Sequence, residues 1–480
     1  YSRARRNRFE DAAILMLAGG AVSALFVGDF VFFVAAAALA GLAAAWTVFA
    51  SPLPGADRAG VRLLIWHGLE GLLFLVGVAL HIAAHAADVK LVRLDVDTIS
   101  GACIFAALMI RVGAPMAHVW FKDVVSHASP AGAAALSSFT TMLGIYALAR
   151  VFPAEPLLMP IGAAMVALGA LYAAAEDDLR RAGAYAMTAQ CGVCLILIGV
   201  GSPLALAAAE GHAFAAMLAF AGLQMAFGGL VERTGVARLS QLTGVARAMP
   251  VSAFLMLMGG LAVSAVPGFA LYATQAVALD ATAQWELRAL WAMIAGLSGV
   301  LFVCLALRPA LAANRPTSGL ALRDEAPFTM LLGGGLAIFL CLSVGFAPRW
   351  LYDLMPAELA FRPFDADRVA PQLELLGAAG LAFMAMRLKG AAPKRQPARL
   401  LDIDALYRGP MAAAGRWTGA VMLGAYGAWQ AATGHAARAA ADRLGRWASA
   451  CDRPFGGPGV SNAAQFLSIG AVLLIILLFT

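Results

Sequence analysis

The residues of greatest chemical interest are ionisable groups that stand inside long apolar stretches. Glu70 lies in the middle of IWHGLEGLLF, His67 lies about one helical turn before it, and Arg111 ends a second apolar stretch. An ionised carboxylate in hydrocarbon is costly unless it is paired or hydrated. We therefore expect Glu70 to pair with Arg111, an arrangement that would hold both charges in place. A rerouted proton relay and a cavity-facing Glu70 with no such role are the alternatives.

A second group of polar residues surrounds a glycine and proline break within residues 110–150. Gly113 and Pro115 interrupt the apolar pattern, and His118 and Asp123 follow on what the sequence suggests is a loop. Ion transporters build sites in a bilayer from broken helices with ionisable residues at the breaks. This stretch is therefore a candidate ion site.

Histidine and cysteine pairs raise the question of a metal or haem. His81 and His85 are four residues apart, and Cys191 and Cys194 form a CxxC inside an apolar stretch. A second cysteine pair or a nearby histidine, which a metal site needs, does not accompany the CxxC. We interpret His81 and His85 as a polar pair near the membrane interface, with haem binding as the minor hypothesis. The expectation is no metal and no cofactor.

Composition fixes the class of protein. The 480 residues are 62% hydrophobic and 13% charged, with a mean hydropathy of +0.80. Apolar runs of about 17–25 residues have the length of helices that cross a bilayer, and they lack the alternation of a barrel strand. The sequence predicts an all-α polytopic membrane protein. Its positive charges lie in short loops between spans, so no nucleic-acid role is expected despite a net charge of +6.

About thirteen transmembrane helices are expected. We place them at 12–28, 30–50, 61–84, 97–113, 130–150, 156–175, 183–202, 205–230, 250–280, 287–307, 327–347, 370–387 and 462–480. If the N-terminal end of the chain is cytoplasmic, 27 of the 34 Lys and Arg residues fall on the cytoplasmic side. Positive charge concentrates on that side of membrane proteins. The prediction is a multi-pass protein of the cell inner membrane; no signal peptide is recognisable, and spans before Tyr1 are left open.

Two of the spans are broken, and the chain divides into three parts. Pro267 and Gly268 interrupt the ninth span much as Gly113 and Pro115 end the fourth, which favours two inverted repeats. Residues 1–387 are expected to form the transmembrane domain. Residues 388–461 are expected to form a linker and a cytoplasmic-side amphipathic helix lying in the membrane interface, and residues 462–480 a C-terminal transmembrane anchor.

Several collinear motifs resemble one known family. LFVGDFVFFVAAAALA, HVWFKDVVSHASP, EDDLRRAGAYAMTAQ, GHAFAAMLAF, VPGFALYATQ and LLDIDALYR are similar to segments of the antiporter-like membrane subunits of respiratory complex I, membrane-bound hydrogenases and Mrp-type cation/proton antiporters, above all the D-type Mrp proteins. The resemblance covers roughly residues 10–310 well and the tail weakly.

The resemblance implies a proton relay of buried Glu, Lys and His, and most of that relay is missing here. The relay glutamate and two relay lysines fall on apolar residues, namely Ala38, Met142 and Phe220. The lysine before the first break falls on Arg111, which cannot release its proton, and the group at the second break falls on Gln275. The matches that survive include His118, Asp123, His212 and Pro267.

The sequence therefore predicts a degenerate antiporter-like subunit of a multisubunit ion-translocating or redox-driven membrane complex. It is expected to have an incomplete proton path and no catalytic activity of its own. The type of complex (quinone oxidoreductase, hydrogenase or cation/proton antiporter) is left open. Expected partners are other antiporter-like and small membrane subunits and lipid, with quinone at a neighbouring subunit as a further option. The alternative is an active proton- or cation-translocating subunit with a relay through Glu70, Arg111, His118 and His212.

Overall fold

The computed structural model describes residues 7–85, 89–316, 324–355 and 361–391, with scattered residues between 410 and 446. The described residues are nearly all helical and include no β-strand. The helices are α1 (Arg8–Phe26), α2 (Phe30–Phe49), α3 (Ala56–Ala84), α4 (Ile99–Val112), α5 (Val119–His127), α6 (Pro130–Val151), α7 (Leu158–Ala175), α8 (Leu179–Val200), α9 (Pro203–Thr234), α10 (Val245–Ala248), α11 (Pro250–Val263), α12 (Ala270–Ala281), α13 (Arg288–Leu301), α14 (Arg308–Ala313), α15 (Phe328–Phe346), α16 (Arg349–Tyr352) and α17 (Ala366–Leu388). A π-helical turn, Phe302–Leu307, joins α13 to α14. The chain divides into two compact units, residues 1–399 and 400–480, and all these helices belong to the first.

The all-α membrane class is confirmed. Ten described helices are long and apolar enough to cross a membrane, and α4 and α11 are shorter apolar helices. Each span expected between residues 12 and 387 coincides with a helix or with consecutive helices. The anchor at 462–480 lies outside the described residues, as does most of the amphipathic helix expected within 401–450. The total of thirteen crossings and the inverted repeat therefore stay predictions.

One stretch differs from its expected conformation. Residues 119–127 form the nine-residue helix α5, whereas the sequence pattern suggested a loop there. Seven of its residues are buried, because the helix packs between α3, α6 and α8. Burial against these neighbours stabilises a helix too short to persist alone.

Short polar side chains begin many of the helices. Asp29 accepts a hydrogen bond from the backbone N–H of Phe32 (2.8 Å) at the start of α2, and Ser129 accepts one from Gly132 (3.0 Å) at the start of α6. These caps satisfy N–H groups that have no partner within the helix. Asn7 caps α1, and Asp11 lies in the first turn of the same helix.

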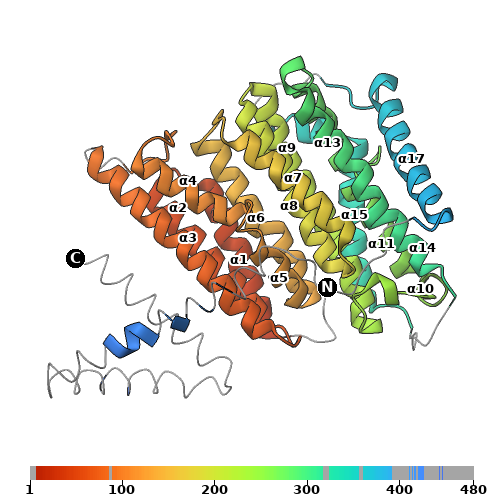
Figure 1. Cartoon of the computed structure of the whole chain (residues 1–480), viewed down its shortest axis with the longest axis horizontal. Helices are drawn as coiled ribbons and strands as arrows, with labels where there is room; N and C mark the ends of the chain where they lie inside the picture. Colours follow the sequence, from red (N-terminus) through yellow and green to blue (C-terminus); the bar gives the residue numbers. More distant parts are fainter. Residues whose placement is uncertain are drawn as a thin grey trace. The chain divides into compact units, whose positions relative to one another are not determined.

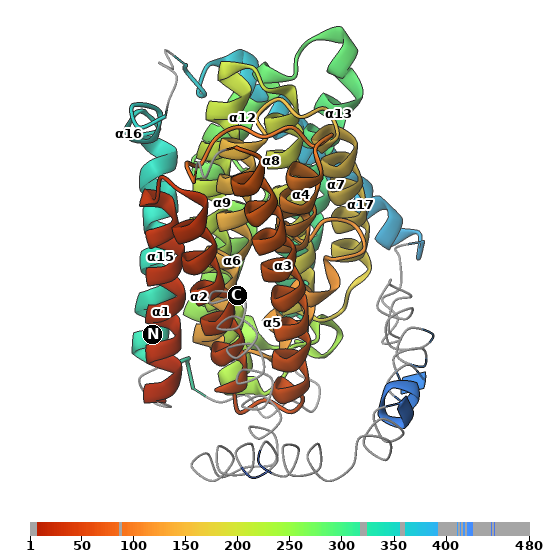
Figure 2. The same ribbon diagram turned by 90° about the vertical axis from the view of Figure 1, so that its left-hand side faces the viewer.

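The centre of the bundle is α8, and its edge is α17. The apolar window of α8 is 94% buried, whereas that of α17 is 17% buried. Figures 1 and 2 both show α17 at the margin of the helical bundle. Close approach of α7 to α8 depends on two glycines: a Cβ at Gly162 would lie 2.5 Å from the carbonyl oxygen of Gly192. Small residues let membrane helices pack at short distance, where dispersion is strongest.

Candidate functional site

The first break separates α4 from α5. Gly113 ends α4 with φ +72°. This is a left-handed backbone conformation, which glycine adopts without strain. Met116 also has positive φ (+76°), so the connection is sharply turned. Trp120 Nε1–H donates to the carbonyl of Ile110 (2.9 Å) and Ala114 N–H donates to that of Met109 (2.9 Å). Carbonyls that the break releases from the helix are thus hydrogen-bonded within the protein.

Arg111 forms the ion pair expected with Glu70. Its Nε lies 2.5 Å from Glu70 Oε1, and its Nη2 donates to the Ala37 carbonyl of α2 (3.0 Å). The two side chains are 3% and 2% exposed. Gly144 of α6 makes room for the arginine, because a Cβ there would lie 3.1 Å from Arg111 Cγ. The guanidinium is therefore held by α3 and α2, and the aliphatic part of the side chain packs against α6.

His67 lies beside this pair without joining it. Its ring packs edge-on against Trp120, with 5.0 Å between centroids. Both ring nitrogens are buried and neither has a hydrogen-bond partner among the described residues. His67 and Glu70 lie one helical turn apart, but they do not form a hydrogen-bonded pair.

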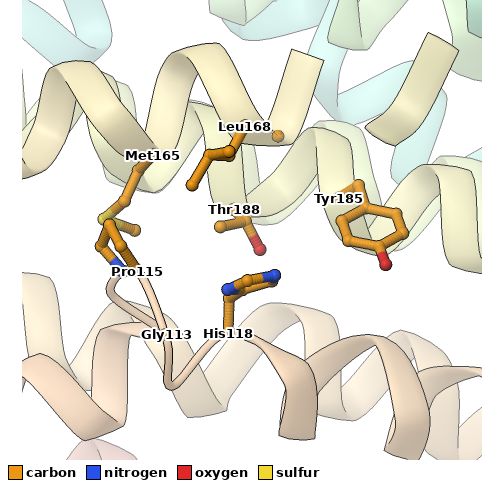
Figure 3. Close-up of a pocket in the computed structure, with 8 residues that line it drawn as sticks. Gly113, Pro115, His118, Met165, Leu168, Tyr185 and Thr188 are labelled. Carbon is orange, nitrogen blue, oxygen red and sulfur yellow. The ribbon is translucent and has the colours of Figure 1, made fainter. Parts of the chain in front are cut away.

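His118 lines a small pocket at the first break. The cavity has a volume of about 10 Å³, and Figure 3 shows the His118 ring directed toward Thr188 of α8, beside Tyr185. Gly113, Pro115, Met165 and Leu168 complete much of its wall. A buried water molecule needs a cavity of roughly 10–15 Å³, so the pocket has room for a single water molecule.

Lys122 is a buried cation that the sequence pattern does not single out. It lies on α5 one turn after His118, is 8% exposed, and donates from Nζ to the Tyr185 hydroxyl (2.8 Å). Tyr185 in turn stacks on Tyr172 of α7, with 5.1 Å between ring centroids. The signal that could have revealed Lys122 is its position four residues after His118, which places the two side chains on one face of a helix.

Asp123, the next residue of α5, contacts a different neighbouring helix. It pairs with Arg62 of α3, and His127 Nδ1 lies 3.6 Å from its Oδ1. Asp123 is 3% exposed, while Arg62 is 38% exposed. Asp123 therefore ties α5 to α3 at the end of the bundle.

The second break is closed by neutral side chains. Ala265 (φ +51°) and Gly268 (φ +104°) turn the chain between α11 and α12, on either side of Pro267. Gln190 of α8 donates to the Val263 carbonyl (3.2 Å), and Gln372 of α17 donates to the Ala265 carbonyl (2.9 Å). Two amides from distant parts of the chain thus occupy carbonyls that the break leaves without helical partners.

His212 belongs to the same network. Its Nε2 lies 2.9 Å from Gln190 Oε1, and its Nδ1 lies 3.2 Å from the Thr274 hydroxyl. Because Gln190 uses its amide nitrogen on Val263, its oxygen faces His212, and the proton of the neutral imidazole then lies on Nε2. The break therefore sets the amide orientation, and the amide sets the tautomer of His212.

The remaining site candidates are spread over separate helices. Gln275 of α12 hydrogen-bonds Ser298 of α13, with 2.6 Å from Nε2 to the hydroxyl oxygen. Met142 and Phe220 are buried at 6% and 0% exposure, whereas Ala38 is exposed on α2. The structure brings these candidates together in two separate pairs. Glu70 meets Arg111, and His212 meets Gln190. These two groups lie on different helices, and the side-chain hydrogen bonds of each lead to its own neighbours.

Comparison with known proteins decides the family. The model of the NADH:quinone oxidoreductase/Mrp antiporter transmembrane family matches residues 54–302, more than half of the chain. The chain belongs to this family. The match contains both breaks and every site candidate named above except Ala38 and Gln372.

Curated relatives align with the chain over part of their length. NADH-quinone oxidoreductase subunit N of Desulforudis audaxviator is 29% identical over 229 residues, which is 44% of the chain and 46% of the relative. NAD(P)H-quinone oxidoreductase subunit 5 of Cryptomeria japonica chloroplasts is 32% identical over 168 residues, 32% of the chain and 23% of the relative. The chain spans less than half the length of these relatives.

Solved structures show the same fold over most of the chain. A chain of the Mrp complex from Dietzia sp. superposes with a TM-score of 0.65 at 19% identity, covering 80% of this chain and 82% of that one. A chain of the membrane-bound sulfane sulfur reductase, an archaeal respiratory complex, gives 0.63 at 18% identity over 76% and 77%. The antiporter-family fold is thus present beyond the residues that the family model matches.

Proposed function

We propose that the chain is an antiporter-like subunit of a multisubunit ion-translocating or redox-driven membrane complex. In this proposal it contributes fold and subunit contacts and carries an incomplete proton path. Its membership of the antiporter family supports the first part. The relatives and structural neighbours are named as subunits or chains of larger membrane assemblies, which supports other membrane subunits as its partners.

One observation carries the second part: Arg111 is fixed by Glu70 and by the Ala37 carbonyl. A relay group must alternate between protonation states. Arginine keeps its proton, and here its positive charge is also neutralised by Glu70. Met142 and Phe220, the apolar residues at two relay positions, also support an incomplete path, because neither side chain can hold a proton.

An active relay through Glu70, Arg111, His118 and His212 is not favoured. The hydrogen bonds of His212 lead to Gln190 and Thr274, which do not titrate. Those of Arg111 lead to its own counter-ion and a backbone carbonyl.

The proposal includes an orientation and a division of the chain. We place the protein in the cell inner membrane with the N-terminal end of this chain cytoplasmic, on the strength of the Lys and Arg distribution. Residues 388–461 would form the linker and lateral amphipathic helix, and residues 462–480 the anchor. Lipid surrounds the subunit, and a quinone would bind at a neighbouring subunit.

Two measurements on the tagged full chain test the proposal. Purification in mild detergent should recover it with other membrane subunits, and a stable, functional monomer would overturn the idea of a complex subunit. In the intact complex, reconstituted into vesicles with a pH-sensitive dye, Glu70→Leu combined with Arg111→Met should leave coupled proton movement unchanged. Loss of proton movement in an assembled double variant would place the relay here.

A further inference from the structure

The least buried membrane helix, α17, carries a carboxylate on its outer face. Glu374 is exposed, and it makes no hydrogen bond or ion pair with any residue that the structure describes. It lies three residues before Gly377, the middle residue of the 23-residue helix, which corresponds to about 4.5 Å along the axis. Because α17 is long enough to cross the bilayer, Glu374 lies inside the expected span 370–387, about 7 Å from its centre toward the N-terminal end of the helix.

The outer face of α17 is opposite the face that packs on the bundle. Gln372, Leu376 and Phe383 are the buried residues of the helix. The helix approaches α13 closely there, since a Cβ at Gly299 would lie 3.1 Å from Ala379 Cβ. At 100° per residue, Glu374 and Leu381 lie within about 40° of the direction opposite to this contact.

Four exposed residues define what we call the Glu374 face: Glu374, Gly377, Ala378 and Leu381. Their spacing of i, i+3, i+4 and i+7 makes one continuous stripe. A Cβ at Gly377 would meet no atom within 4 Å, so the surface beside the carboxylate is open. Small residues at such a position let another helix come close enough for a short side chain to reach across.

A carboxylate directed at lipid is costly in either protonation state, because the ion loses its hydration and the neutral acid loses its hydrogen bonds. Ionisable residues within membrane helices generally face a partner. Glu70 follows that rule, since it is paired with Arg111. By contrast, the exposed side of α15 presents Leu332, Leu336 and Phe339, which lipid can cover without cost.

We propose that the Glu374 face docks a transmembrane helix of a neighbouring membrane subunit, and that this helix brings a Lys, Arg or His side chain to Glu374. Charge complementarity selects this occupant over a purely apolar helix, which would leave the carboxylate unpaired. The inference rests on the proposed function, since it assigns the complex one of its contacts.

Photocrosslinking in native membranes tests the contact. p-Benzoylphenylalanine is placed at position 378 of the tagged full chain, with position 336 on α15 as the matched lipid-facing control. Crosslinked peptides are identified by mass spectrometry. Position 378 should crosslink to an apolar helix of another subunit that carries a basic residue within one turn of the crosslink, and position 336 should give lipid adducts.

Substitutions at Glu374 then separate charge from packing. Glu374→Leu should lower the crosslink yield at position 378 about three- to twentyfold, the range that interhelical polar contacts contribute in membranes. Glu374→Lys should abolish the crosslink, and exchanging the partner's basic residue for Glu should restore it.

The outcomes distinguish this inference from the proposed function. A crosslink only to lipid or to residues 462–480 of the same chain, or a yield unchanged in Glu374→Leu, overturns the contact while the chain still co-purifies with other subunits. Recovery of the chain as a functional monomer overturns the proposed function and the contact together.

Discussion

Removing one charge of the Glu70–Arg111 pair should destabilise the protein far more than removing both. In Glu70→Leu, Arg111 keeps only the Ala37 carbonyl for a guanidinium that is 3% exposed. An uncompensated buried charge costs about 3–5 kcal/mol, whereas replacing a buried pair with apolar residues is often neutral or stabilising. Glu70→Leu with Arg111→Met should therefore recover most of the loss.

Equilibrium unfolding of the purified protein in mixed detergent micelles measures this difference. A recovery of about 3 kcal/mol corresponds to more than a hundredfold in the unfolding equilibrium constant. Leu69→Ala, on the exposed face of the same helix, serves as the control and should change stability little. The reasoning is refuted if the double variant is as unstable as Glu70→Leu, because the cost would then come from lost packing at position 70.

Three further predictions concern the second break, the packing of α7 on α8, and a buried tyrosine. Gln372→Leu leaves the Ala265 carbonyl buried without its donor, so it should lower the free energy of unfolding by about 1–3 kcal/mol in the same assay. Leu373→Ala, on the exposed side of α17, is the control. Gly162→Ala forces a Cβ to within 2.5 Å of the Gly192 carbonyl oxygen and should lower stability by about 1–3 kcal/mol; unchanged thermal stability would contradict the close packing of α7 on α8. Burial raises the pKa of Tyr352 above its usual range, so the unfolded chain loses this proton at lower pH than the folded chain. Stability should therefore fall as the pH rises above about 10, and less steeply in Tyr352→Phe.

The helices and one charge pair can be predicted from the sequence, for simple reasons. Apolar runs of membrane length have few alternatives to the helix. Glu70 and Arg111 can be matched because membrane-depth charges are rare and a buried one requires its opposite. Asp29 follows a glycine and precedes an apolar run, which is the position of a cap.

The closure of the breaks could not be predicted, because it depends on neutral residues far away in the chain. Gln190 and Gln372 lie 73 and 107 residues from the carbonyls they bind, and an amide in an apolar stretch carries no charge signal. In the sequence Lys122 counts among the loop cations, because VWFKDVVSH has the polarity of a loop. Only the packing of α5 against α8 buries it beside Tyr185.

The Glu70–Arg111 pair also has an electrical consequence. Moving one elementary charge through a potential of 100 mV involves about 2.3 kcal/mol of work. A carboxylate and a guanidinium that stay joined carry no net charge, so the transmembrane voltage does almost no work when the two shift together. At the second break, Gln190, Gln372 and Gln275 are uncharged as well. The charge pair at the first break and the amides at the second are therefore nearly insensitive to membrane voltage.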